Sequence, residues 1–415
     1  MIKNQPEIGI YVGQGASHSW TWFADIFDRE AYTNVSFLND GDIASGALSG
    51  VDVFFVSGGD TFAIAQGLGK NGADAIEKFV SFGGIYIGAC AGAYLPLNSS
   101  LPPLNQFNFV ATRIANLTKD LPEAVAKPEK FCTEYGCRYV YHPVRESVRL
   151  RLTGWGRDGQ YVEAPLYGGP ALIPSGDAEV LAEYAGFTDS TEFLIDREIA
   201  SRALLGTAAA IKKDYGSGAF YLFGPHFEHP DFPEANGLLF EIFTGSMSGQ
   251  RSRATGEARH PVEEKQYRAF LSAVSNARIM ALALERSSYS WLIGRKMYDP
   301  EKIRVFLEAI WKRARLLEAP ACLACIESSA IELLTGQVVE VAESIQKLRS
   351  DALPRAQETA FAEFLFLTLR KAAAAFLTIY FHLKRGGVLH QQRRSTCTIA
   401  TCISRQPRHS IQPRS

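Results

Sequence analysis

The feature that most constrains the fold is a regular alternation of short apolar runs with helical stretches over residues 7–245. Short runs that are apolar on both faces are typical of strands buried in a parallel sheet. The expected strands are residues 8–12, 51–56, 84–88, 205–211 and 219–223. The expected helices are residues 20–27, 61–68, 74–82 and 237–243. The alternation predicts an α/β fold, a flavodoxin-like, mostly parallel sheet covered by helices on both faces.

A change of composition after Gly249 predicts a second region with a different fold. Residues 250–261 are mostly polar and charged, as in a linker. Beyond them, apolar residues recur at three- and four-residue spacing, which predicts an all-α region of four or five helices. The expected segments are an α/β domain over 1–249, a linker over 250–261, a helical bundle over 262–385 and a disordered basic tail over 386–415.

Composition narrows the classes of partner. The formal net charge of -1 argues against general electrostatic binding of nucleic acid, although the arginine-bearing tail leaves a basic arm as an alternative. The longest mostly apolar run near the end, residues 372–381, is shorter than the roughly 20 residues of a membrane span, so no membrane partner is expected. The 7 scattered cysteines and the absence of a signal-like start predict reduced thiols and a cytoplasmic protein.

The strongest chemical signal is the sequence GACAG at residues 88–92, which ends one of the expected strands. Small residues on both sides of a cysteine permit the sharp strand-to-helix turn of a nucleophile elbow. The N-terminus of the following helix favours a thiolate, so Cys90 is the candidate nucleophile. The alternative is a buried structural cysteine whose neighbouring glycines serve only packing.

A second motif, GPHFEHP at residues 224–230, follows the last expected strand. Because sites in open α/β sheets lie at the carboxyl ends of strands, His226 and Cys90 are expected at the same edge. His226 can accept the thiol proton, and Glu228 can hold the imidazole in the required tautomer. His229 is the competing base, and a loop histidine without a partner is the alternative.

A third motif, SGGD at residues 57–60, follows the expected strand 51–56. Glycines at this place let backbone N–H groups approach a developing oxyanion, and the residue after the nucleophile supplies a second N–H. The candidate oxyanion-hole residues are Gly58, Gly59 and Ala91. An ordinary glycine turn is the alternative.

In this order, the three motifs resemble those of class I glutamine amidotransferases. The resemblance is closer to one branch, the N-terminal domain family of biotin–protein ligases, because of IYVGQGAS at residues 10–17, GACAGAYLP at 88–96 and YGGP at 167–170. It covers roughly residues 7–245 and implies a cysteine-dependent amidase or amidotransferase-like hydrolase that acts on a small carboxamide. On this resemblance, the catalytic triad is Cys90, His226 and Glu228.

Loops beside these motifs supply further candidates. The expected substrate contacts are Ser17, Tyr167, Gly168 and Gly169, and His18 is a candidate for the mouth of the site. Structural turns and a solvent-facing histidine are the alternatives. No cofactor and no metal is expected, although a zinc site from Cys132, Cys137 and His142 is conceivable, and the CxxC of Cys322 and Cys325 is interpreted as part of a helical core.

The region after the resemblance leaves a second functional hypothesis open. No Gly-Arg-Gly-Arg-type loop of a biotin ligase catalytic domain occurs between residues 250 and 415, so biotin ligase activity is not expected. The chain also carries no recognisable domain that would receive ammonia. The alternative function is therefore a non-catalytic regulatory or binding module whose helices over 262–383 recruit a protein partner.

Overall fold

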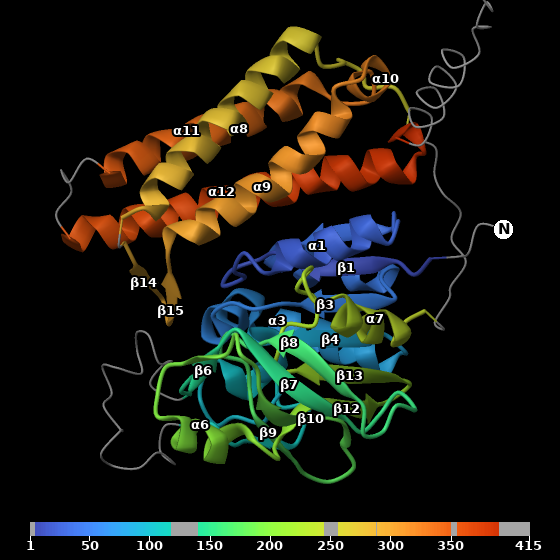
Figure 1. The fold of residues 1–415 in the computed structure, drawn as a ribbon. Coiled ribbons are helices and arrows are strands. Elements are labelled where there is room, and N and C mark those ends of the chain that lie inside the picture. Colours follow the sequence, from blue (N-terminus) through green and yellow to red (C-terminus); the bar gives the residue numbers. More distant parts are fainter. Residues whose placement is uncertain (1–4, 118–139, 245–255, 288, 350–354, 390–415) are drawn as a thin grey trace, which may run out of the picture.

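The computed structural model describes residues 5–117, 140–244, 256–287, 289–349 and 355–389. An α/β region built on one large sheet lies beneath a bundle of long helices, with the helices of the second region packed along one side of the first (Figure 1). The predicted fold class is confirmed. The predicted tail lies almost wholly outside the described residues, as does half of the predicted linker.

Five parallel strands form one half of the sheet, in the order β2-β1-β3-β4-β13, and the sequence predicted all of them except β2. They are β1 (Ile8–Tyr11), β2 (Val35–Leu38), β3 (Val53–Val56), β4 (Ile85–Ala89) and β13 (Gly218–Phe223). Phe55 of β3 packs on Phe23 and Phe27, whereas its neighbour Phe54 packs on Phe79. Because successive side chains of a strand point to opposite faces, this strand is buried on both.

Helices cover both faces of this parallel half. Phe23 and Phe27 belong to α1 (Trp20–Arg29), and α7 (Pro233–Glu241) lies beside it through contact of Phe240 with Phe27. Phe79 belongs to α3 (Thr61–Ser81) on the other face. The two helices predicted over 61–68 and 74–82 are both parts of α3, whose backbone is non-helical at Gly69. The remaining short helices of this region are α2 (Asp40–Ala44), α4 (Ala91–Tyr94) and α6 (Arg197–Leu204).

An antiparallel extension continues the sheet beyond β13, in the order β12-β10-β7-β8. The strands are β12 (Ala208–Tyr215), β10 (Glu179–Phe187), β7 (Ser147–Leu152) and β8 (Tyr161–Pro165), with β5 (Thr112–Ile114) and β9 (Leu172–Pro174) attached at the side and β6 (Val144–Arg145) paired with β11 (Glu192–Phe193). The strand predicted over 205–211 was placed too early. Gly206, at φ 79°, forms the turn after α6, so the strand begins at Ala208.

The second region is helical, as predicted, but it also contains a short hairpin. Its helices are α8 (Glu264–Glu285), α9 (Pro300–Ala314), α10 (Pro320–Leu323), α11 (Ser328–Arg349) and α12 (Arg355–Arg385). Pro300 and Pro320 are the first residues of their helices, as proline's fixed φ favours. The unpredicted hairpin pairs β14 (Trp291–Ile293) with β15 (Lys296–Tyr298) and reaches down toward the α/β region (Figure 1).

Helix α12 is longer and more apolar than the sequence analysis assumed. Over Gln357–Arg385 its length and composition are sufficient to cross a membrane, and 56% of its most apolar window is buried inside the protein. The run over 372–381 is therefore only part of a longer apolar helix. Within the protein this helix contacts α9, α11 and strand β2, which accounts for its buried face.

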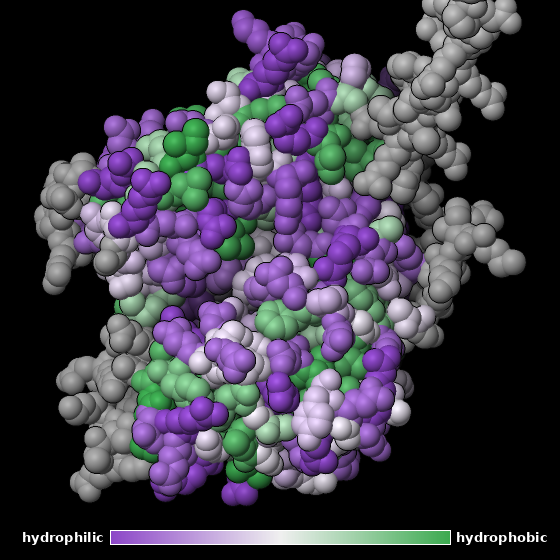
Figure 2. Space-filling model, in the orientation of Figure 1, coloured by the Kyte–Doolittle hydropathy of each residue, from purple (hydrophilic) through white to green (hydrophobic). Residues whose placement is uncertain are grey.

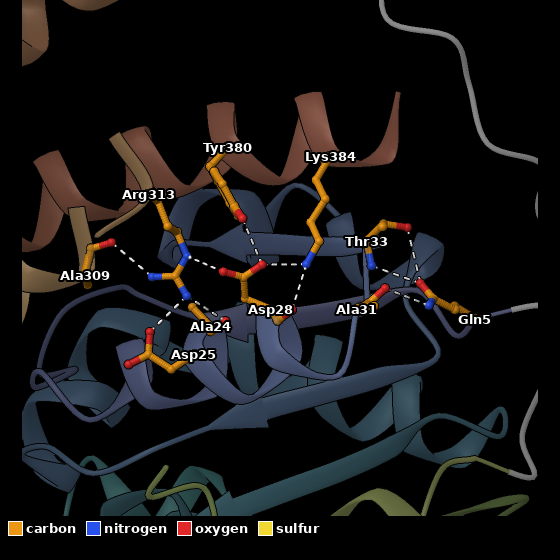
Figure 3. Close-up of polar contacts among 10 residues, drawn as sticks. All are labelled: Gln5, Ala24, Asp25, Asp28, Ala31, Thr33, Ala309, Arg313, Tyr380 and Lys384. Atoms are coloured by element: carbon orange, nitrogen blue, oxygen red, sulfur yellow. Dashed lines mark hydrogen bonds and ion pairs between the residues drawn. The ribbon is translucent and has the colours of Figure 1, made fainter. Parts of the chain in front are cut away.

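A cluster of charges joins the helical region to α1 (Figure 3). Asp28 accepts hydrogen bonds from Lys384 at 2.5 Å and from the Tyr380 hydroxyl at 2.9 Å, and it forms an ion pair with Arg313 at 3.2 Å. Arg313 is 1% exposed and also bonds Asp25 at 2.9 Å. Burial raises the pKa of Asp28, but Arg313 and Lys384 more than offset this effect and hold that pKa below its ordinary value.

We predict that Asp28→Ala lowers the free energy of unfolding by about 3 kcal/mol, because it leaves two buried cations without their shared anion. Since the pKa of Asp28 is depressed in the folded protein, this contribution is present near neutral pH and is lost as the pH falls through that pKa. Urea denaturation at neutral and acidic pH measures both effects. Asp74→Ala, which breaks an exposed pair with Lys70, is the control and should cost less than about 0.5 kcal/mol. Equal losses in the two variants would contradict the prediction.

Candidate active site

The predicted sharp turn is present at Cys90. Strand β4 ends at Ala89, Cys90 has φ 52° and ψ -109°, and α4 begins at Ala91. A Cβ added at Gly92 would lie 1.9 Å from the carbonyl oxygen of Val56, and one added at Gly88 would lie 2.2 Å from that of Gly92. Positive φ at a non-glycine residue costs about 1–3 kcal/mol, so the surrounding packing must impose this conformation.

His226 and Glu228 lie at the same edge as Cys90, as the chain order predicted. The backbone N–H of Cys90 donates to the carbonyl of Phe223, the last residue of β13, at 2.9 Å. Nδ1 of His226 is 2.7 Å from Oε1 of Glu228, and the His226 imidazole is close enough to the Cys90 thiol that each shifts the pKa of the other. Both residues are buried, and the Ser57 hydroxyl donates to the same Glu228 oxygen at 2.7 Å.

The protonation of Cys90 and His226 is coupled. Burial raises the pKa of the Cys90 thiol, but the hydrogen bond and charge of His226, with the charge of Lys296, bring that pKa below its ordinary value. Burial lowers the pKa of His226, but Glu228 and the hydrogen bond with Cys90 reverse the effect and raise it. These shifts favour a thiolate beside an imidazolium. Helix α4 has 4 residues, so its dipole contributes little, contrary to the expectation from sequence.

The competing base, His229, has a different environment. Its ring lies 4.5 Å from that of Trp22, and its Nδ1 is 4.0 Å from the exposed carboxylate of Asp231. Burial lowers the pKa of His229 below its ordinary value. It lines the same cavity as Cys90, but the histidine that lowers the pKa of the Cys90 thiol is His226.

Two of the three oxyanion-hole candidates line the same cavity as the Cys90 thiol. Gly59 and Ala91 line the cavity with Cys90, and the backbone N–H of neither has an acceptor among the described residues. Gly58 instead lies behind the imidazole: a Cβ there would be 2.8 Å from Cε1 of His226. Its carbonyl accepts from the backbone N–H of Ser17 at 3.0 Å, so Gly58 gives His226 room rather than lining the cavity.

The four predicted substrate contacts divide in the same way. Tyr167 and Gly168 line the cavity, and the Tyr167 carbonyl oxygen is 3.8 Å from the Cys90 sulfur. Gly169 does not line it, because it packs so tightly on Gly224 that an added Cβ would be 1.7 Å from the carbonyl oxygen. Ser17 is fully buried, with its hydroxyl 3.0 Å from Nδ1 of His18. These two predictions are corrected: Gly169 and Ser17 occupy packing positions beneath the wall.

The cavity in front of the thiol has a volume of about 1490 Å³ and is walled by both regions of the chain. His18 lines it, as expected, together with Trp22 and His142 from the α/β region. The helical region adds residues that the sequence analysis missed, from β15 and α9, and the principal ones are Lys296, Met297 and Lys302. On the face drawn in Figure 2, the boundary between the helical region above and the α/β region below is mainly hydrophilic.

No metal site is found among the residues that the structure describes, where no three His, Cys, Asp or Glu side chains gather suitably. Cys132 and Cys137, which were considered as zinc ligands, lie outside those residues. Cys322 is buried and Cys325 is half-buried, and burial raises the pKa of Cys322 to about 11. This agrees with the interpretation of the CxxC as part of a helical core.

The fold and this site define an α/β protein that presents a cysteine at a sharp strand-to-helix turn, beside a buried histidine–glutamate pair. Residues 48–274, more than half of the chain, match the family model described as Biotin-protein ligase, N terminal, and the chain belongs to that family. The resemblance inferred from the motifs is therefore confirmed. No curated protein matches the chain in sequence.

Solved structures show only distant similarity. A β-galactosidase from Bacillus circulans sp. alkalophilus is 14% identical at a TM-score of 0.35, over 57% of this chain and 30% of the other. A putative GMP synthase component from Thermoplasma acidophilum is 15% identical at 0.35, over 58% and 94%. A putative ThuA-like protein from Bacteroides uniformis is 15% identical at 0.33, over 59% and 91%. The chain thus spans less than a third of the β-galactosidase, and similarities this distant do not bear on activity.

We predict that iodoacetamide alkylates Cys90 well below the ordinary thiol pKa of about 8.5 and that His226→Ala slows this reaction at neutral pH by at least about tenfold. Without the imidazole, burial is left to raise the pKa of the thiol. The rate of Cys90 labelling, followed by peptide mass across neutral and alkaline pH, measures the shift. His229→Ala is the matched control, and a slowing of the same size in this variant would contradict the assignment of His226.

Proposed function

We propose that the chain is a cysteine-dependent amidase or amidotransferase-like hydrolase that acts on a small carboxamide. The observation that carries this proposal is the hydrogen-bonded pair of His226 and Glu228, buried beside the Cys90 thiol at the wall of a large cavity. A thiol, a base and a group that orients the base are the parts that covalent catalysis of acyl transfer needs. Membership of the family supports the fold of this site but not a particular reaction.

In the proposed reaction, the Cys90 thiolate forms a bond to the carboxamide carbon and the carbonyl electrons move onto oxygen. The N–H groups of Gly59 and Ala91 donate to this oxyanion, which explains two donors without an acceptor at the cavity wall. The imidazolium of His226 then protonates the departing nitrogen, and ammonia leaves as the thioester forms. Glu228 keeps Nδ1 of His226 protonated and oriented throughout.

Hydrolysis of the thioester uses the same groups in reverse. Neutral His226 takes a proton from water, whose oxygen attacks the thioester carbon, and the products are a carboxylic acid and the regenerated thiolate–imidazolium pair. Glutamine is the substrate class typical of the amidotransferases that the motifs resemble. On this proposal, the ammonia either diffuses into solution or is transferred to a separate acceptor molecule.

A binding role for the helical region remains a second candidate. Large apolar side chains are exposed along α8 and α11, namely Ile279 at 65% and Leu333 at 63%. Exposed apolar surface on a helix pair is a feature of protein interfaces. On this proposal, the bundle recruits a protein partner through α8 and α11 while its opposite side closes the cavity.

We predict that Cys90→Ala abolishes release of ammonia from carboxamides, because it removes the nucleophile. The thermal unfolding temperature should stay nearly unchanged, because the substitution removes only one sulfur atom and loses few packing contacts. A panel of small primary amides, including glutamine, assayed for ammonia, provides the test. Cys325→Ala is the control, since that thiol lies in the helical region away from the cavity. Turnover that persists in Cys90→Ala, or none with any amide in the unmodified protein, would rule out the mechanism.

A further inference from the structure

Lys296 is a charged residue in the cavity that the proposed mechanism does not use. It lies in β15, so it is carried to the site by the hairpin of the helical region (Figure 1). It lines the cavity with Cys90, and the two charges are close enough that each affects the pKa of the other. The hairpin is fixed there, because the backbone N–H of Arg295 donates to Oδ2 of Asp60 at 2.7 Å.

The ammonium group of Lys296 has no counter-ion of its own. Among the described residues it makes no hydrogen bond or ion pair, although two carboxylates lie near it. Asp299 is paired with Lys302 through Oδ2, while its Oδ1 is buried without a hydrogen-bond partner, and Asp60 caps the start of α3 and accepts from Arg295. Burial lowers the pKa of Lys296 below its ordinary value. A half-buried ammonium without a partner is expensive, and an anion in the cavity would remove that cost.

The cavity wall that holds Lys296 also contains an unsatisfied imidazole nitrogen and a second cation. Nδ1 of His142 is buried without a hydrogen-bond partner, and its ring lies against Gly168 on the cavity wall. Burial, Lys296 and Arg145 together lower the pKa of His142 to about 3, so the imidazole is neutral at physiological pH. Arg145 also lines this part of the cavity. A neutral imidazole can donate one hydrogen bond to an anion that two cations attract.

We propose that Lys296, with His142 and Arg145, forms a subsite for a carboxylate of the substrate. The proposal deepens the proposed function and rests on it in one respect: it narrows the substrate to small carboxamides that also carry a carboxylate. Lys296 is then the residue by which the helical region determines specificity, since a hydrogen-bonded ammonium selects an anion by charge and by geometry. The subsite and the thiol line the same cavity, so one substrate molecule can place its carboxylate at Lys296 and its carboxamide at Cys90.

Two alkylating reagents of nearly equal size test this subsite at the thiol. Iodoacetate carries a carboxylate and iodoacetamide does not, so the ratio of their rates at Cys90 measures attraction of an anion independently of thiolate content. We expect the ratio to exceed that of N-acetylcysteine and to fall by about tenfold or more in Lys296→Gln, while Lys296→Arg retains most of it. Lys312→Gln, which removes a cavity lysine already paired with Asp25, is the matched control and should keep the ratio.

A second measurement does not depend on the thiol. In the Cys90→Ala protein, succinate should raise the unfolding temperature more than the neutral diamide succinamide, and Lys296→Gln in that background should remove the difference. An unchanged rate ratio in Lys296→Gln, together with no loss of stabilisation by succinate, would overturn the subsite. If Cys90 reacts slowly with both reagents but succinate still binds through Lys296, the subsite stands and the proposed hydrolase activity falls. If Cys90 is alkylated fast but Lys296→Gln changes neither measurement, the reactive thiol of the proposed hydrolase stands and the subsite falls.

Discussion

At Cys90 the chain leaves strand β4 with a positive φ, and the carbonyl groups around it leave no room for a side chain at Gly88 or Gly92. Strand β13, which ends three residues before His226, is hydrogen-bonded alongside, and the carbonyl of its last residue accepts from the N–H of Cys90. The position of the sulfur relative to the imidazole is therefore fixed by the register of two strands rather than by side-chain packing alone. Because the site is attached to rigid strands, its donors and acceptors are held in a fixed geometry.

Four of the five parallel strands were predictable because their signal is local, whereas β2, whose two middle residues are only half-buried, was missed. Strands buried on both faces are continuous apolar runs, and the intervening helices repeat at their own period. The antiparallel half, apart from β12, was not predictable, because strand β7 alternates buried apolar residues with exposed arginines, a pattern that follows only once its neighbours in the sheet are known. The β14–β15 hairpin escaped for a similar reason: each strand has 3 residues, too few to show a period.

The candidate site was predictable where a motif ties chemistry to a strand end. Cys90, His226 and Glu228 each follow such a strand, and the structure brings them together. Ser17 and Gly169 belong to loops of the right sequence, but whether a loop residue lines a cavity or supports its wall depends on packing between distant segments. Lys296 gave no signal at all, because nothing in a short hairpin within a helical region indicates what it will touch.

Asp60 links the two regions because each of its carboxylate oxygens accepts a hydrogen bond from a different region. Oδ1 caps α3 directly after the SGGD loop, and Oδ2 holds the backbone of Arg295 in the hairpin. The helical region is thus bound to the loop that presents Gly59, so the cavity exists only while the two regions are docked. By thermodynamic reciprocity, any molecule that binds across the cavity must tighten the association of the regions by the same free energy that docking adds to its binding. The helical region supplies one half of the cavity wall and is covalently linked to the other half. Its effective concentration relative to the α/β region is therefore high in every molecule.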